Sequence, residues 1–133
     1  MLYASLINMN EKNVIYGING PVVTVKNTKS FSMMEMVYVG SCRLIGEVIG
    51  ITDELTTIQV YEETTGLKPG EIVEGTGGPM KVCLGPGLLD NIFDGIERPL
   101  KAIEEQSGAF ISRGASVEPL DTEKLWETEI LVK

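Results

Sequence analysis

The sequence predicts a mainly β fold, a small sandwich or barrel, followed by a short helical connector. Of the 133 residues, 43% are hydrophobic but only 6% are aromatic, so the core is expected to consist mainly of Val, Ile, Leu and Met. Short β-branched segments recur about every ten residues over the first half of the chain, with turn signals between them. From Gly87 onward the apolar residues follow a helical spacing instead.

Six segments of the first half are expected to form the strands. The segments contain β-branched or aromatic residues, and Gly, Asn and Pro bound the first two of them. Glycines inside such segments favour positions where the sheet curls or closes. A Lys-Pro-Gly turn at 68–70 lies within the last segment. The segments are 13–20, 21–27, 34–40, 43–52, 54–63 and 64–77.

The second half is expected to begin with one more short strand at 81–85 and then to become helical. Leu88, Leu89, Ile92, Phe93 and Ile96 form an i, i+4 stripe that predicts a helix over 88–96. A second helix is expected over 99–108, because Pro99 suits a first turn and Gly108 suits a C-terminal stop. Short extended pieces follow, as a partial β segment whose sheet is incomplete.

Composition and charge exclude several classes of function. The formal net charge of -8 and the absence of a Lys/Arg cluster argue against nucleic acid or an anionic membrane as the main partner. The chain has no His, and Cys42 and Cys83 form no CxxC pair, so Cys/His zinc sites and His-based catalysis are excluded within it. These features predict a reduced, cytoplasmic protein. There is neither a signal-peptide pattern nor an apolar run of ~20 residues.

Two glycine-rich stretches invite a phosphate-binding interpretation, and the residues argue against both. In 74–81, Lys81 is followed by Val82 rather than by a hydroxyl residue, and Pro79 has no N–H to donate. In 85–90, the last position of a G-x-G-x-x-G motif is Asp90, and Asp94 adds a second negative charge. We interpret the first stretch as a turn that leaves the barrel and the second as a hinge.

Two further clusters are interpreted as structural. The methionines near residue 34 are expected to fill the core rather than to form a ligand-binding surface. The paired glutamates are expected on a solvated face, because neighbours on a strand point to opposite sides of the sheet. The residues are Met33, Met34 and Met36, and Glu62, Glu63, Glu104 and Glu105.

Most of the chain from Asn13 onward resembles the N-terminal part of the catalytic A subunit of archaeal and vacuolar-type rotary ATPases. The segments that carry the resemblance are "NVIYGINGPVVTV" (13–25), "EMVYVGSCRLIGEVIGI" (35–51), "GAFISRGASVEPLD" (108–121), and above all the specific run from "QVYEETTGLKPGEIV" to "LGPGLLDNIFDGIERPL", which ends at Leu100. Glu97 stands where the family pattern has Gln.

The resemblance implies a closed, Greek-key-like β-barrel of the kind that starts F-type and V-type ATPase subunits. In the family these barrels alternate with those of the B subunit in a ring that holds the hexameric head together. The implied divisions are an N-terminal extension or leader (1–12), the barrel (13–79), a connector toward the nucleotide-binding domain (80–111) and the start of the bulge region (112–133). The chain is expected to be either a fragment of such a subunit or a short gene product that keeps the assembly domain.

The resemblance carries no catalytic, cofactor-binding or metal-binding residue onto this chain, because the family's P-loop and Mg-ATP pocket come later in its sequence. It implies partners within the ATPase, the B subunit first and other subunits of the complex beside it. It also implies a place in the cytoplasmic head, which reaches the membrane only through the complex. The candidate connector and interface residues are Gly85, Gly87, Leu88, Leu89, Ile92, Phe93 and Ile96.

Two rival functions follow from the residues. A stand-alone module would recognise a protein or small ligand through the barrel and the apolar stripe, and the isolated chain would then be expected to self-associate. An OB-like nucleic-acid binder is disfavoured by the -8 charge and the few aromatic residues.

Overall fold

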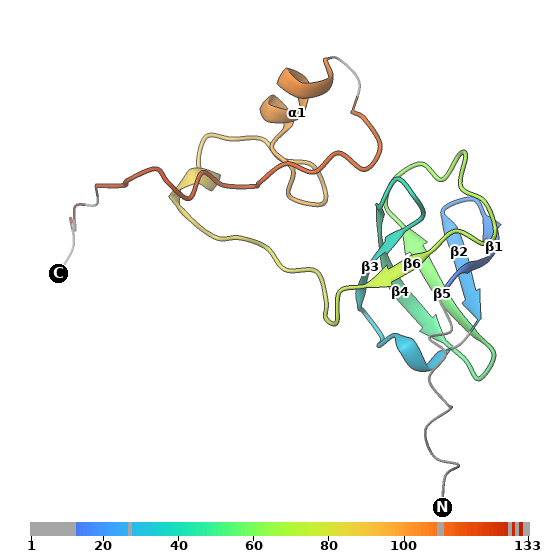
Figure 1. The fold of residues 1–133 in the computed structure, drawn as a ribbon. Coiled ribbons are helices and arrows are strands. Elements are labelled where there is room, and N and C mark those ends of the chain that lie inside the picture. Colours follow the sequence, from blue (N-terminus) through green and yellow to red (C-terminus); the bar gives the residue numbers. More distant parts are fainter. Residues whose placement is uncertain (1–12, 27, 109–110, 128, 130, 132–133) are drawn as a thin grey trace, which may run out of the picture. The chain divides into compact units, whose positions relative to one another are not determined.

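The computed structural model describes residues 13–26, 28–108, 111–127, 129 and 131 (Figure 1). The chain divides into two compact units, Met1–Met80 and Lys81–Lys133. The first unit contains the strands, and the second is mostly irregular backbone with one α-helix. The expected N-terminal extension, residues 1–12, lies outside the described residues.

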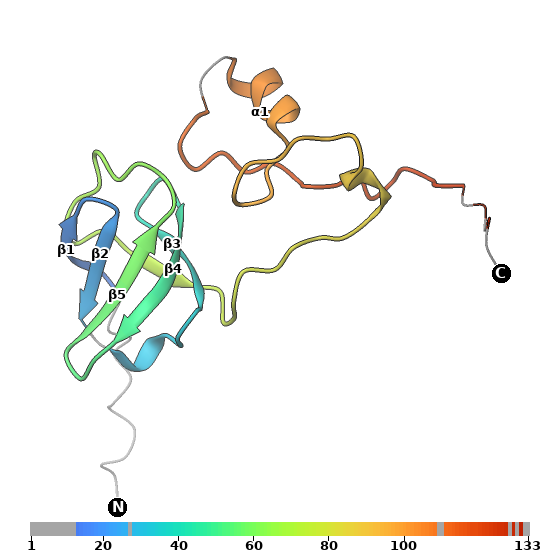
Figure 2. The same cartoon turned by 180° about the vertical axis from the view of Figure 1, so that it is seen from behind.

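The first unit is a curled antiparallel sheet in the order β1-β2-β5-β4-β3-β6 (Figures 1 and 2). Strands β3, β4 and β5 are joined in sequence order as antiparallel hairpins. Strand β2 pairs with β5 and is linked to β3 by a long connection. This is a Greek-key arrangement. Each of the six segments expected to form strands contains one, so the predicted fold class is confirmed. The strands are β1 Ile15–Asn19, β2 Val22–Lys26, β3 Met36–Val39, β4 Leu44–Ile51, β5 Leu55–Val60 and β6 Val73–Gly75.

The two edge strands of this sheet are joined by a short seam. Val14 and Ile72 form an isolated antiparallel bridge. The Ile15 N–H donates to the Glu71 carbonyl at 2.8 Å, and the Gly70 N–H donates to the Ile15 carbonyl at 2.8 Å. The start of β1 is therefore bonded to the segment that leads into β6, and the sheet closes on itself, which satisfies backbone groups that an open edge would leave unpaired.

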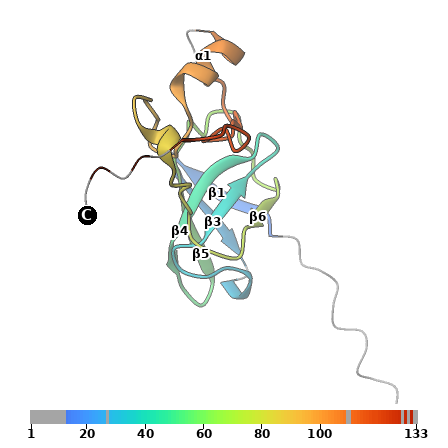
Figure 3. The same ribbon diagram turned by 90° about the vertical axis from the view of Figure 1, so that its left-hand side faces the viewer.

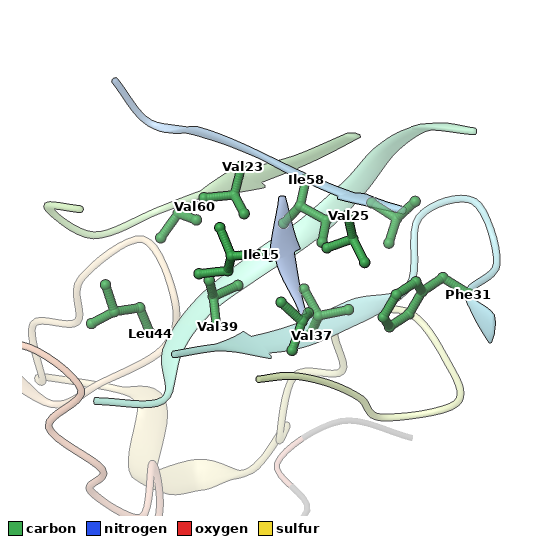
Figure 4. Packing of buried hydrophobic residues seen from close by; sticks show 11 residues of the cluster. Ile15, Val23, Val25, Phe31, Val37, Val39, Leu44, Ile58 and Val60 are labelled. Atoms are coloured by element: carbon green, nitrogen blue, oxygen red, sulfur yellow. The ribbon is translucent and has the colours of Figure 1, made fainter. Parts of the chain in front are cut away.

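The barrel encloses one core of side chains that are aliphatic except for Phe31, shown from close by in Figure 4. Buried and more exposed residues alternate along β2, β3 and the first part of β4, so one face of each strand supplies the core. Full burial of a side chain of this size contributes about 1.5–3 kcal/mol. The core residues are Ile15, Val23, Val25, Phe31, Val37, Val39, Leu44, Val48, Ile58, Val60 and Val73.

The methionines expected in the core lie outside it. Met33 and Met34 are 54% and 59% exposed, and Met36 is half-buried on the outer face of β3. Met34 has a φ of 64°, in the left-handed region that a non-glycine residue rarely adopts. The chain turns outward there, and the residue that enters the barrel beside this turn is Glu35.

Glu35 is a buried carboxylate, only 5% exposed. One of its oxygens accepts the Ser32 N–H at 2.8 Å and the other accepts the Gly77 N–H at 2.9 Å. A side chain at Gly75 would collide with the carboxylate, so the glycine leaves the space that Glu35 occupies. The carboxylate thus ties the long β2–β3 connection to the chain that leaves β6.

Glycines let β4 and β5 approach closely and let β4 bend. A Cβ atom at Gly46 would lie 2.9 Å from the Gln59 carbonyl oxygen, which is backbone and cannot move cheaply. The pairing of β4 with β5 shifts register between Val48 and Gly50. This irregularity bends the strand at the position where the sequence predicted a corner.

The second unit contains a 3-10 turn, η2 Pro86–Leu88, and one helix, α1 Leu100–Ser107. The helix expected over 99–108 is confirmed, with Pro99 at its N-cap and Gly108 at its C-cap with a φ of 73°. Only Ile103 of this helix is buried.

Two other expectations for the second unit are wrong. Residues 88–96 do not form a helix, because Asp90 has a φ of 62°, which interrupts the helical hydrogen-bond ladder. Residues 81–85 do not form a strand, since in the described chain no neighbouring strand pairs with them. For the same reason the described part of 112–133 differs from the expected partial β segment and contains no strand.

We predict that Gly46→Ala destabilises the barrel by about 1–3 kcal/mol, since its new methyl group meets the Gln59 carbonyl. Gly50→Ala in the same strand is the control, because its Cβ would lie at an ordinary 3.6 Å from Thr57. Urea unfolding of both variants measures the difference. Equal stabilities would refute a close approach at Gly46.

We predict that Glu35→Ala lowers the free energy of unfolding by about 2–4 kcal/mol, because two N–H groups lose a charged acceptor. The exposed Glu54, in the β4–β5 turn, provides the control Glu54→Ala, with an expected change within about 0.5 kcal/mol. Thermal unfolding followed by circular dichroism compares them. A Glu35→Ala variant as stable as the control would contradict the clamp.

Candidate interface segment

The candidate interface residues lie in the irregular stretch before α1 and do not share one face. Leu89 and Ile92 are 75% and 73% exposed. Leu88, Phe93 and Ile96 are half-buried. The apolar stripe expected from the sequence therefore splits into two side chains that project to solvent and three that pack within the second unit.

Gly85 and Gly87 provide space for a side chain from far along the chain. A Cβ atom at either glycine would lie 3.1 Å from a methyl group of Leu120. At Gly87 it would also lie 3.7 Å from the Trp126 ring. The two glycines thus permit the 118–126 segment to pack on the 85–87 turn, which is a structural reason for their presence that involves no phosphate.

Asn91 fixes the turn that follows η2. Its side-chain amide donates to the Gly87 carbonyl at 2.7 Å and makes a longer contact of 3.4 Å with the Leu89 carbonyl. These are carbonyls that a continuing helix would bond through its backbone, so the Asn side chain stabilises a non-helical path. Together with the left-handed Asp90, this contact explains why Leu89 and Ile92 remain on the surface.

Asp94 and Arg98 form the polar centre of the second unit. Arg98 is only 7% exposed, and its Nε donates to one Asp94 carboxylate oxygen at 2.7 Å. The other oxygen accepts the backbone N–H groups of Ile96 at 3.1 Å and of Arg98 at 2.9 Å. Arg98 also donates to the Ala115 carbonyl at 3.1 Å, which ties the 94–98 turn to the chain after α1.

These bonds decide the pKa of Asp94. Partial burial by itself would raise the pKa of this carboxyl group. The hydrogen bonds from the Arg98 backbone and guanidinium and from the Ile96 N–H outweigh it, and the pKa is held below its ordinary value. Asp94 is therefore an ionised structural anchor. The sequence offered one signal for it, an acidic and a basic residue at i, i+4 spacing.

Glu97, which stands where the resemblance has Gln, also has a structural contact. Both of its carboxylate oxygens lie within 3.0 Å of the Cys83 N–H. The residue itself has a φ of 64°. Glu97 thus joins the start of the second unit to the turn before α1, a connection between residues 14 positions apart that sequence reasoning missed.

A hollow of about 510 Å³ lies within the second unit, between the 85–99 stretch and the 118–126 segment. Phe93, Leu120 and Trp126 give it an apolar lining, and Lys124 stacks on the Trp126 ring at 4.2 Å. Glu118 and Asp121 also line it. Two carboxylates at its wall make it unsuited to phosphate, in agreement with the interpretation of 85–90 as a hinge.

Large apolar side chains are exposed on both units. Exposed apolar side chains mark a contact surface where they form one contiguous patch. Those of the second unit are Val82, Leu84, Leu89, Ile92, Ile111, Leu125, Trp126 and Leu131.

Neither a metal centre nor a membrane segment is found in the part of the chain that the structure describes. Those residues contain no group of three His, Cys, Asp or Glu side chains able to hold a metal ion. Cys42 and Cys83 are exposed thiols. Among the described helices, none has the length and apolar character needed to cross a bilayer.

Known proteins are similar to this chain over both units. The beta-barrel domain model of the ATP synthase alpha/beta family matches residues 15–77. The V-type ATP synthase alpha chain of Halothermothrix orenii is 53% identical over 125 residues, which cover 94% of this chain and 21% of that protein. The A subunit of the A-type ATP synthase of Natronomonas pharaonis is 49% identical over 127 residues, with 96% and 22% covered. The chain therefore spans about a fifth of the length of these curated relatives.

We predict that Asp94→Asn opens the 94–98 turn. The asparagine NH₂ group, which replaces one carboxylate oxygen, cannot accept the hydrogen bond from the Arg98 Nε–H. A hydrogen bond to a charged partner contributes about 1.5–3 kcal/mol. Amide hydrogen exchange at Ile96 and Arg98 is expected to accelerate about tenfold or more. Asp90→Asn, at an exposed position in the same stretch, is the control and is expected to leave both rates unchanged.

The pH dependence of this protection has a defined sign. The folded-state pKa of Asp94 is lowered. The stabilisation of the 94–98 turn by its carboxylate is therefore complete above the unfolded-state pKa of about 3.9 and is lost as the pH falls through the lower folded-state pKa. In Asp94→Asn, the acid-dependent loss of amide protection at Ile96 and Arg98 should be absent. A variant that keeps the same acid dependence would show that another group causes it.

Proposed function

We propose that this chain, whose residues 15–77 belong to the beta-barrel domain of the ATP synthase alpha/beta family, is the N-terminal assembly domain of an A/V-type ATP synthase catalytic subunit. The observation that carries the proposal is the extent of the similarity. Identity of 49–53% continues beyond the barrel through the connector and covers 94–96% of this chain. These relatives are named as the alpha chain or the A subunit of such enzymes, and their names support the same assignment for this chain.

The residues of the chain support assembly rather than catalysis as its role. The 133 residues contain no G-x-x-x-x-G-K-[ST] sequence, the motif that cradles nucleotide phosphates. In the glycine-rich 74–81 stretch the Gly77 N–H already donates to Glu35, and the Thr76 hydroxyl donates to the Met36 carbonyl at 2.8 Å. Groups that would bind a phosphate are thus used to hold the barrel together.

In this proposal the barrel stands in a ring with the barrels of the B subunit, while the second unit leads toward the nucleotide-binding domain. Its exposed leucines, Leu84 and Leu89 among them, are then covered by the rest of the protein. ATP synthesis or hydrolysis, and its coupling to ion transport, belong to the whole enzyme. The chain takes part from the soluble head, peripheral to the membrane.

A second candidate function is a stand-alone interaction module. The exposure of Leu89 and Ile92, at 75% and 73%, favours it, because an exposed apolar patch marks a contact site. The two candidates differ in what they bind. An assembly domain binds the B subunit in equal numbers, whereas a stand-alone module self-associates or binds a small ligand.

We predict that calorimetric titration of the purified chain with Mg-ATP gives no binding heat, and that sedimentation with the B subunit of the same organism gives a one-to-one complex. Micromolar ATP affinity with turnover would overturn the proposal. Failure to bind the B subunit, together with self-association measured by light scattering, would favour the stand-alone module.

A further inference from the structure

One outer wall of the barrel differs from the others in the side chains that it presents. Figure 3 shows β3 and β4 lying side by side. Tyr38 lies opposite Ile45 and Met36 lies opposite Glu47, with all four on the face away from the core. The Tyr61 N–H, just after β5, donates to the Ile45 carbonyl at 2.9 Å, so the set continues onto the next strand. We define the outer β3–β4 wall as Met36, Tyr38, Ile45, Glu47, Ile49 and Tyr61.

The wall is more apolar than the neighbouring outer face of β2 and β5. Ile49 and Tyr61 are each 45% exposed, and Met34 reaches the same strand pair, since its N–H donates to the Val48 carbonyl at 2.9 Å. On β2 and β5 the corresponding outer face carries Thr24, Lys26, Thr57 and Gln59 beside Val22 and Leu55. Tyr, Met and Ile gathered on one wall resemble the centre of a protein interface rather than a solvated surface.

Polar contacts hold the side chains of this wall in place. The Tyr61 hydroxyl donates to the Glu47 carboxylate. The Arg43 guanidinium stacks on the Tyr38 ring at 4.2 Å and pairs with Glu74. Side chains that are already ordered lose less conformational entropy when a partner binds, so the wall is preorganised for contact.

The charges around the wall are mainly negative. Glu47 lies within it, Glu74 lies across β3 from Ile45, and the Glu62 carboxylate approaches the Ile45 N–H at 3.4 Å. Arg43 is the nearby cation, and Glu74 already pairs with it. A second copy of the same wall would bring carboxylates against carboxylates, in a chain with a net charge of -8.

We propose that the outer β3–β4 wall is a docking surface for a protein partner that presents an apolar centre bordered by Lys or Arg side chains. Apolar contact with Ile49 and Tyr61 supplies the centre, and the glutamates select the basic border. The identity of the partner as another component of the same enzyme rests on the proposed function.

The test uses the whole chain, with the purified B subunit serving as the probe. Tyr61→Ala and Ile49→Asp are expected to weaken binding about tenfold or more, as removal of a central interface residue does. Tyr16→Ala is the matched control, because Tyr16 is a 55% exposed tyrosine on β1, which neighbours neither β3 nor β4 in the sheet. It is expected to change the affinity less than twofold. Unfolding midpoints of all variants show that each barrel is intact.

The outcomes separate the two proposals. If the unchanged chain binds and Tyr16→Ala weakens binding as much as Tyr61→Ala, the wall is wrongly assigned while the assembly function stands. If both tested wall variants bind normally, the wall is likewise refuted. If the unchanged chain does not bind the B subunit, both the assembly function and the partner assigned to this wall are refuted.

Discussion

The buried carboxylate of Glu35 is the interaction on which the barrel most depends. Within the long β2–β3 connection, Met34 and Glu35 exchange backbone hydrogen bonds with Val48 of β4, and the Glu35 carboxylate adds acceptors for the N–H groups of Ser32 and Gly77. Phe31 can then enter the end of the core, while Met33 and Met34 turn to solvent. The same contact uses the backbone N–H of Gly77 in the glycine-rich stretch, so that group is not free to bind a phosphate.

Carboxylates repeat this role elsewhere in the chain. Glu71 accepts the Ser41 and Lys68 N–H groups, each at 2.8 Å, and the hydrogen bond from Ser41 is the main reason that its pKa is lowered. Asp94 and Glu97 do the same in the second unit. In a protein with many turns and little helix, acidic side chains replace regular secondary structure as acceptors for backbone N–H groups. Part of the negative charge of the chain is therefore structural.

The strands were predictable from the sequence because β-branched runs between turn residues specify them locally, and α1 was predictable because Pro99 and Gly108 mark its ends. The helix predicted over 88–96 is wrong, because the spacing of apolar residues does not reveal the left-handed backbone of Asp90 or the hydrogen bond of the Asn91 side chain. The role of Gly85 and Gly87 depends on Leu120, far along the chain, which no local pattern contains. The methionines were misplaced because their hydrophobicity was visible and the turn that points them outward was not.

The seam of the barrel has a consequence for its synthesis. Val14 meets a partner, Ile72, that the ribosome adds roughly sixty residues later. At a synthesis rate of about 5–20 residues per second, one edge of β1 stays unpaired for about 3–12 seconds. An unpaired edge is a template for pairing with another nascent chain. The register shift between Ile15 and Gly17, in the pairing of β1 with β2, places a bulge in β1, and a bulge makes an edge strand a poorer template for such pairing.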